Sequence, residues 1–331
     1  QPRVDSSPAT ISVNGASYEV RQLLSLPHRH RGVLWNSLPP PRGTFYTLLD
    51  VDICFESKQF LDCLQRLPKR QGSLPSLRNY DCVDRRLRMI VDWCQGIDLQ
   101  SYLDRVSQQR SYLPIGVWEA VRRMRALAHA CCCLHQDCRI IHGDIKPSNL
   151  ILPSERIPIC LIDFGSSWQI EKTRGRFEGD GSDPFYSAPE VFENEAVIDG
   201  RADQFSVAVI LFQMLTGQLP YQRMGGKAGH AANRHEFEGT LESTADLSVA
   251  VRQLPQELPR KIDDLINRAL SLESRRRFAT MRAFANALDD VFKQLESTRV
   301  TVAELQDRST RLSAKPSLWR RIVDGRFGQR F

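Results

Sequence analysis

Two carboxylates, an amide and an amine lie close together in one part of the sequence. Asp144, Lys146 and Asn149 fall within residues 140–152, and Asp163 follows a second apolar run. Carboxylate and amide oxygens suit Mg²⁺, and phosphoryl transfer also needs an orienting base and a cation. The pattern therefore predicts phosphoryl-transfer chemistry, in which Asp144 orients the attacking hydroxyl and Lys146 neutralises the moving group. Asn149 and Asp163 are the predicted metal ligands.

Predicted secondary structure brings the chain to these residues. Residues 117–134 carry an apolar stripe with helical spacing and end just before the first run. Pro147 stops a helix inside that run, so the chemistry-bearing residues are expected on a loop. A second apolar helix is predicted from Asp203 to Leu215, where Gly217 ends it.

The motifs of this region resemble those of the protein kinase family. His142, Asp144 and Asn149 match the catalytic loop H-R-D-x-x-x-x-N, residues 163–165 match D-F-G, and residues 188–190 match A-P-E. The lysine and proline of the loop resemble the serine/threonine branch, and a later run, L-T-G-Q-L-P-Y, resembles its bacterial members. An isolated Asp or Asn often only makes a turn, but three motifs in order favour the family.

The resemblance implies an α+β, bilobal protein kinase-like fold, with a small, mainly antiparallel β lobe plus one helix and a large, mainly helical lobe. The implied small lobe covers residues 18–94 and the large lobe residues 95–297. Residues 1–17 are expected to form a flexible leader, residues 223–246 a flexible excursion and residues 298–331 a separate tail. We expect the basic tail either to contact a membrane surface or partner, or to pack on the large lobe.

ATP and Mg²⁺ are the cofactors that the resemblance implies, together with a protein substrate or signalling partner. Asp92 and Cys94 fall where the family presents its backbone to adenine. Asp98 falls where a family carboxylate binds the ribose, although the same residue suits the N-cap of a helix that begins at Leu99. Both interpretations of Asp98 stay open.

The small lobe departs from the family pattern in three places. Residues 25–30 contain none of the glycines that let a phosphate-binding loop approach its ligand. Leu49 stands where the family has a lysine, and Phe60 stands where it has the glutamate that pairs with that lysine. Loss of both partners together is self-consistent, because a single buried charge left unpaired would be costly.

Two functions fit this pattern. The first is a serine/threonine protein kinase with an altered nucleotide clamp, in which Arg29, Arg31 or Lys58 reaches the phosphates in place of the missing lysine. The second is a pseudokinase that binds a nucleotide or a protein without turnover, because a fold alone does not establish an activity. We take the kinase as the first interpretation.

Five further residues have roles that the resemblance implies. Gly143 replaces the arginine that clasps an activating phosphate, so activation through that clasp is not expected. Asp183 replaces a threonine of the substrate platform. Glu190 and Arg277 are predicted to form a buried ion pair, and Asp203 is predicted to anchor the catalytic loop.

Composition restricts the other classes of protein. The 331 residues are 41% hydrophobic and 25% charged, which are ordinary globular values. A net charge of +6 is modest for this length, so no nucleic-acid partner is expected. The sequence begins at Gln1, which is compatible with removal of an upstream piece. It shows no apolar run of membrane-spanning length and no signal-peptide pattern, so we expect a cytoplasmic protein without a transmembrane segment.

Nine cysteines lie between Cys54 and Cys160, inside predicted strands and helices. We expect them to be buried free thiols in a reducing compartment. Residues 131–133, with His135 and Cys138, lack the paired C-x-x-C spacing of zinc sites. We therefore predict no zinc site there.

Overall fold

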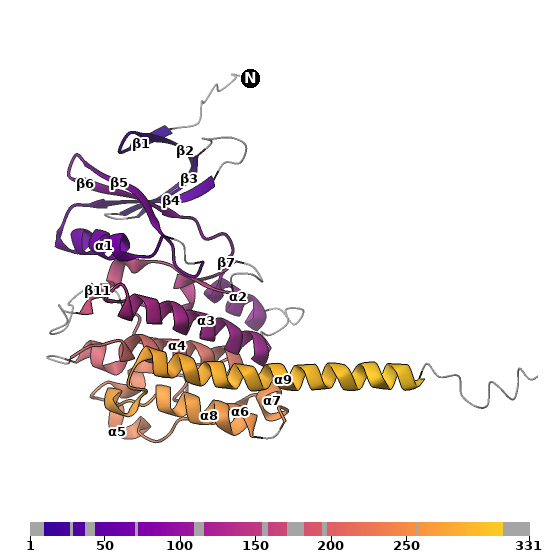
Figure 1. Ribbon diagram of the computed structural model, residues 1–331. Helices are drawn as coiled ribbons and strands as arrows, with labels where there is room; N and C mark the ends of the chain where they lie inside the picture. Colours follow the sequence, from indigo (N-terminus) through magenta and orange to yellow (C-terminus); the bar gives the residue numbers. More distant parts are fainter. Residues whose placement is uncertain are drawn as a thin grey trace, which may run out of the picture.

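The computed structural model has a β-sheet lobe near the N-terminus and a helical lobe next to it (Figure 1). The structure describes residues 10–26, 29–36, 44–69, 72–108, 116–153, 158–170, 182–193, 197–255 and 257–313. This arrangement is the α+β, bilobal one that the sequence predicts.

An antiparallel sheet of six strands forms the small lobe, in the order β1-β2-β3-β4-β6-β5. The strands are β1 (Thr10–Val13), β2 (Ala16–Leu26), β3 (Arg29–Asn36), β4 (Thr44–Asp52), β5 (Leu77–Val83) and β6 (Arg86–Asp92). Helix α1 (Phe55–Arg66) follows β4 and covers the sheet on the side of the large lobe (Figure 1).

The sheet begins earlier in the chain than we expected. Strand β1 lies inside residues 1–17, the expected flexible leader, and pairs with β2 in antiparallel register. Val13 packs with Tyr18, Leu48 and Ile90 in a small core of its own. Because this contact removes apolar surface from water, the hairpin is held on the sheet.

Helix α1 begins at a capping box. The Ser57 amide donates to Sγ of Cys54 at 3.4 Å, and the Cys54 amide donates to the Ser57 hydroxyl at 2.9 Å. These bonds satisfy amides that have no partner within the helix. The helix therefore starts at Phe55.

Helices form most of the large lobe. They are α2 (Leu99–Gln108), α3 (Val117–Gln136), α4 (Arg201–Thr216), α5 (Arg234–Phe237), α6 (Thr244–Leu247), α7 (Val249–Arg252), α8 (Leu258–Ala269) and α9 (Met281–Ser313). Both helices that we located from their apolar pattern, α3 and α4, are present. α3 and α9 lie side by side, and α4 is buried on nearly every side (Figure 1).

The last helix crosses the expected boundary of the tail. α9 begins at Met281 and continues to Ser313, so the chain at residue 298 is in the middle of a helix. Figure 1 shows its end running past the other helices of the lobe. Residues 314–331, the rest of the predicted tail, lie outside the described residues. The contacts expected for the tail stay predictions.

The predicted flexible excursion over residues 223–246 is wrong. This segment holds a 3₁₀ turn, η5 (Gly225–Gly229), as well as α5 and α6. The Gly226 amide donates to the Phe185 carbonyl at 2.9 Å. A Cβ on Gly225 would lie 2.1 Å from the same carbonyl oxygen, so the close approach requires glycine there. Tight backbone packing explains the order of this segment.

The expectation that all cysteines are buried free thiols is also wrong. Cys94 and Cys160 form a disulfide, and the thiols of Cys54 and Cys82 are exposed. The pairing joins residues that are 66 positions apart, so no local pattern could reveal it. In the part of the chain that the structure describes, no helix combines the length and apolar character needed to cross a membrane.

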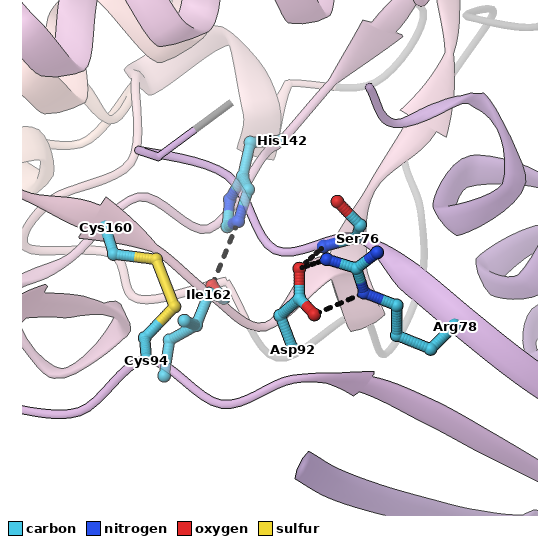
Figure 2. The surroundings of a disulfide bond; sticks show 7 residues. All are labelled: Ser76, Arg78, Asp92, Cys94, His142, Cys160 and Ile162. Carbon is cyan, nitrogen blue, oxygen red and sulfur yellow. Dashed lines mark hydrogen bonds and ion pairs between the residues drawn. A yellow bond between two sulfur atoms is a disulfide. The ribbon is translucent and has the colours of Figure 1, made fainter. Parts of the chain in front are cut away.

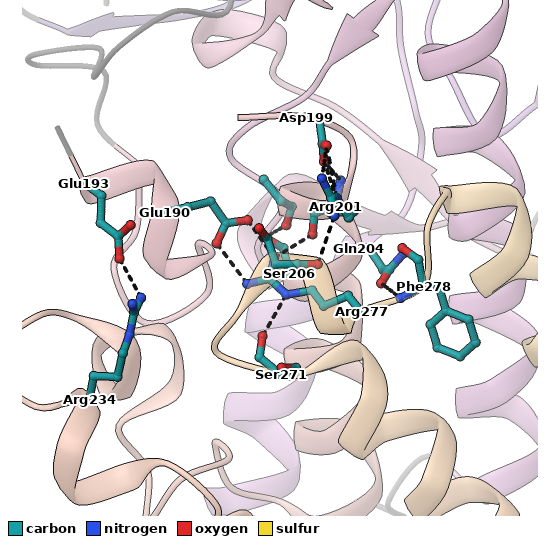
Figure 3. Close-up of polar contacts among 12 residues, drawn as sticks. Glu190, Glu193, Asp199, Arg201, Gln204, Ser206, Arg234, Ser271, Arg277 and Phe278 are labelled. Atoms are coloured by element: carbon teal, nitrogen blue, oxygen red, sulfur yellow. Dashed lines mark hydrogen bonds and ion pairs between the residues drawn. The ribbon is translucent and has the colours of Figure 1, made fainter. Parts of the chain in front are cut away.

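A buried ion pair ties the end of the activation segment to the late helices, as predicted. Arg277 donates to both carboxylate oxygens of Glu190, at 2.7 and 2.9 Å (Figure 3). The Arg277 side chain is fully buried and that of Glu190 is 9% exposed. Further bonds to the carbonyls of Ser271 and Arg201 bring the number of hydrogen bonds from the guanidinium to four. Such a buried pair is stable only when further hydrogen bonds of this kind support it.

We therefore expect Arg277→Met to destabilise the protein by about 3–5 kcal/mol, because it leaves a buried carboxylate unpaired. The free energy of unfolding, measured in urea, tests this. Arg260 provides a matched control, since its contact with Asp264 is 3.8 Å long and both side chains are exposed. Arg260→Met should change stability by less than about 1 kcal/mol. An equal effect of the two substitutions would contradict the structural role of the buried pair.

Candidate active site

Asp203 of α4 holds the backbone of the catalytic loop. Its carboxylate accepts hydrogen bonds from the amides of His142 and Gly143, each at 2.9 Å, and contacts Nε2 of His135 at 2.8 Å. Burial alone would raise the pKa of Asp203, but the bonds from His135 and Gly143 outweigh it and lower that pKa. Asp203 is thus a charged anchor below the loop, as predicted.

The catalytic loop brings Asp144, Lys146 and Asn149 together. Asn149 donates through Nδ2 to the Asp144 carbonyl at 2.8 Å and to Oδ2 of the same residue at 3.0 Å. Nζ of Lys146 lies 2.7 Å from that Oδ2. The turn that allows this is a 3₁₀ helix, η1 (Pro147–Asn149), which begins at the proline that prevents a longer helix.

One oxygen of Asp144 is left open. Oδ1 is buried and has no hydrogen-bond partner among the residues that the structure describes. Burial raises the pKa of Asp144, and the hydrogen bond and positive charge of Lys146 oppose that rise. A buried acceptor without a donor is costly, so we expect a water molecule or a ligand hydroxyl to supply one.

A short hairpin carries Asp163 to the same place. Strands β9 (Leu150–Leu152) and β10 (Cys160–Leu161) are antiparallel, and the Ile162 amide donates to the Asn149 carbonyl at 2.9 Å. Asp163 follows directly, with a positive φ of 65° that is rare outside glycine. Backbone strain of this kind concentrates at functional sites. The hairpin therefore sets the two predicted metal ligands at one end of the same pair of strands.

Phe164 packs against His142 and so connects the catalytic loop to the segment that carries Asp163. Its ring meets that of His142 edge to face, with centroids 4.8 Å apart, and is almost fully buried. Nε2 of His142 also lies 3.2 Å from the Ile162 carbonyl (Figure 2). Burial lowers the pKa of His142, which favours the neutral ring at this position. The loop and the hairpin are thus packed as one unit.

A cavity of about 180 Å³ lies between the lobes, above this unit. It is lined by the hinge residues Asp92 and Cys94, by Asp163, and by Leu49 and Phe60. Pockets for drug-sized ligands usually measure about 300–1,000 Å³. The cavity suits a flat ring rather than a whole nucleotide, and the apolar pair Leu49 and Phe60 narrows it without closing it.

The segment that joins the lobes is held at Asp92. Arg78 donates to both carboxylate oxygens of Asp92, at 2.5 and 2.9 Å, and the Ser76 amide donates to one of them at 3.1 Å (Figure 2). The side chain of Asp92 is therefore engaged with Arg78 of β5 and with the Ser76 amide, and both Asp92 and Cys94 line the cavity. Trp93, which the sequence did not single out, also lines the cavity and is 41% exposed.

Asp98 shows the capping interaction that the sequence left open. It ends β7 (Ile97–Asp98), and its carboxylate accepts bonds from the amide and the hydroxyl of Ser101, both at 2.7 Å. These bonds cap α2. Asp98 is outside the set of residues that line the cavity. A role in binding ribose stays a prediction.

The protein kinase domain family matches residues 76–288 of the chain. This chain belongs to the protein kinase family. Similar proteins include serine/threonine-protein kinase ATG1a of Arabidopsis thaliana, 35% identical over 153 residues (44% of this chain, 22% of the relative). Serine/threonine-protein kinase ULK3 of Homo sapiens is 29% identical over 225 residues (67% and 43%). Serine/threonine-protein kinase A of Synechocystis sp. is 24% identical over 242 residues (66% and 44%).

A solved kinase domain has the same fold. The crystal structure of the Mycobacterium tuberculosis PknI kinase domain aligns with a TM-score of 0.58 and 21% identity, covering 85% of this chain and 97% of that chain. The chain spans about a fifth to about a half of the length of these curated relatives. The family match begins at Ser76, so Leu49 and Phe60 lie before it.

A tryptophan occupies the place where the family arginine would extend. Gly143 has a φ of +78°, and a Cβ added to it would lie 2.0 Å from Cζ3 of Trp168. Trp168 is 1% exposed and belongs to β11 (Trp168–Gln169), which pairs with β8 (Ile140–Ile141). Nothing in the sequence indicated this contact, since Trp168 follows the D-F-G motif at a position with no motif of its own. An apolar contact thus fills the space beside Gly143, where the resemblance implies an arginine.

We expect Gly143→Ala to destabilise the protein by about 1–3 kcal/mol, because the new methyl group meets the indole and the backbone is left-handed. Urea unfolding measures the loss. In a double-mutant cycle, Trp168→Leu should recover part of the loss, since it removes the obstructing ring. Strict additivity of the two substitutions would show that the ring and the glycine are not coupled.

Proposed function

We propose that the chain is a serine/threonine protein kinase that transfers the γ-phosphoryl group of Mg-ATP to a protein hydroxyl. The observation that carries the proposal is the open Oδ1 of Asp144, buried beside the Lys146 ammonium and the Asn149 amide. In this setting Asp144 accepts the hydrogen bond of the attacking hydroxyl. Lys146 offsets the negative charge of the moving group.

Asn149 and Asp163 are the residues that would hold Mg²⁺. Among the described residues, no group of three or more His, Cys, Asp or Glu side chains is arranged to hold a metal ion. Two oxygen ligands suit Mg²⁺ that arrives with a triphosphate, because Mg²⁺ usually keeps waters and phosphate oxygens in its shell. When bound, Mg-ATP supplies the phosphoryl group, and its Mg²⁺ ion offsets the negative charge of the phosphate oxygens.

The lobe-joining segment and the cavity would hold the base. Asp92 and Cys94 line the cavity, where peptide groups of this segment would pair with the edge of adenine. The apolar walls from Leu49 and Phe60 suit its faces. The phosphates would then lie outside this small cavity, toward Asp163 and the catalytic loop.

Arg31 is the best placed of the three proposed replacements for the missing lysine. In the antiparallel ladder of β3 and β4, Arg31 pairs with Leu49, and Arg29 pairs with Val51 further along. Directly paired positions belong to the same face of a sheet. Arg31 is thus the register partner, on the neighbouring strand, of the position that has lost its lysine. Lys58 is exposed on α1.

We also propose that the substrate is a protein and that the chain is located in the cytoplasm. The relatives named above are serine/threonine kinases, which supports a protein hydroxyl as acceptor. Seven cysteines of the described chain lie outside any disulfide, which supports a reducing compartment.

We expect Asp144→Asn and Asp163→Asn each to lower phosphate incorporation from labelled ATP by at least about a hundredfold, because each removes a preorganised group of the transfer step. Both autophosphorylation and a generic protein substrate should be measured. Asp104→Asn, on the exposed face of α2, is the control and should keep full activity. Equal incorporation by wild type and both site variants, or none by any, would favour the pseudokinase.

We expect Arg31→Ala to weaken Mg-ATP binding by about tenfold or more, since a charge-assisted contact is worth about 1.5–3 kcal/mol. Thermal-shift titration gives the dissociation constant. Arg29→Ala and Lys58→Ala are matched charge controls and should bind nearly as wild type. The hypothesis of a replacement cation fails if all three variants bind Mg-ATP as tightly as the wild type does.

The raised pKa of Asp144 sets the acid limit of the reaction. The carboxylate form accepts the hydroxyl proton, so kcat should fall as the pH drops through this pKa. That pKa is raised above the ordinary value of an aspartate. Lys146→Met removes the cation that opposes the effect of burial, so the acid limb should move to higher pH. A pH–rate profile of both proteins measures the shift. An unmoved limb in Lys146→Met would exclude Asp144 as the titrating group.

A further inference from the structure

A disulfide lies at the wall of the nucleotide cavity. Cys94 belongs to the segment that joins the lobes, and Cys160 begins β10 in the large lobe (Figure 2). Their Cα atoms are 6.7 Å apart. Cys94 itself lines the cavity, and Cys160 pairs across the ladder with Ile151, which lines it too. The bond therefore ties together two sides of the site.

The joining segment is fixed at one point on each side of the disulfide. Before it, Arg78 and the Ser76 amide hold Asp92. After it, Gly96 presses on β9, since a Cβ there would lie 2.4 Å from the Leu152 carbonyl oxygen. The disulfide is the covalent tie between these two noncovalent ones. Its loss would leave residues 93–95 free to move away from β10.

The surrounding chemistry suits a reversible bond. Seven other cysteines of the described chain lie outside any disulfide, among them the buried Cys131 and Cys138, so the protein as a whole is rich in reduced thiols. A disulfide in such a setting is more often redox-active than structural. Cys94 is partly exposed, whereas Cys160 is 1% exposed, so an attacking thiolate can reach one sulfur only.

We propose that Cys94 and Cys160 form a reversible thiol–disulfide site that controls entry of the nucleotide into the cavity. The disulfide holds the joining segment against the large lobe and restricts the hinge motion that opens the cleft. Its reduction releases that motion. The inference rests on the proposed function in so far as the ligand is an adenine nucleotide.

The reductant is a dithiol. One of its thiolates attacks Sγ of Cys94, the bond between the two cysteines breaks, and Cys160 leaves as a thiolate that takes up a proton. The second thiol of the reductant then displaces Cys94 from the mixed disulfide. The products are two cysteine thiols and the disulfide of the reductant, so two electrons and two protons pass to the protein. A disulfide oxidant reverses the exchange.

The test compares the full chain after treatment with diamide and after treatment with dithiothreitol. Differential alkylation and peptide mapping report the state of Cys94 and Cys160. Stopped-flow fluorescence with N-methylanthraniloyl-ADP and Mg²⁺ reports the association rate. We expect at least about threefold faster association in the reduced protein, because hinge opening then limits entry less.

Variants distinguish the effect of this disulfide from the effects of the other thiols. Cys94→Ser and Cys160→Ala should associate at the fast rate under both treatments, while Cys82→Ser, which removes an exposed free thiol on β5, should behave as wild type. The comparison of the two wild-type states needs no variant, so misfolding of Cys160→Ala leaves the test intact.

A mapped disulfide with equal association rates in both states overturns this inference but not the proposed function. Absence of the disulfide in the oxidised protein also overturns it. Absence of nucleotide binding in both states overturns the proposed function as well.

Discussion

The carboxylate of Asp203 is the constraint on which the rest of the site depends. It is fully enclosed, and a buried charge is tolerated only when donors surround it. Two consecutive amides, those of His142 and Gly143, supply those donors. The backbone that precedes Asp144 is fixed in this way by a helix far along the chain. The position of the Asp144 carboxylate is thus a consequence of how α4 packs in the core.

Two places where the resemblance implies charged residues are apolar in this chain. Leu49 and Phe60, which the resemblance aligns with an ion pair, line the cavity, and Trp168 covers Gly143, which it aligns with a phosphate-binding arginine. At the first place both charges are absent together, which avoids a buried charge without a counterion. The polar groups of the site, Asp144, Asn149 and Asp163, belong to the large lobe.

Contacts between distant segments tie the large lobe together. The Glu190 and Arg277 pair links the activation segment to the late helices, and Gly225 and Gly226 hold the next segment against Phe185. The small lobe is joined to it through α1, which packs on the D-F-G region by the bond from Gln59 to the Ser167 carbonyl at 3.2 Å, and through the segment around Cys94. The segment around Cys94 is therefore the place at which a hinge motion between the two lobes would act.

The sequence by itself determined the local chemistry: the spacing of Asp144 and Asn149, the D-F-G turn and the amphipathic helices follow from patterns a few residues long. It also implied the Glu190 and Arg277 pair through the family resemblance. Only the tertiary structure decided the β1 hairpin, the bond between Cys94 and Cys160 and the contact of Trp168 with Gly143. Each of these depends on which surfaces meet after folding, and short-range periodicity does not encode the partner of a distant residue.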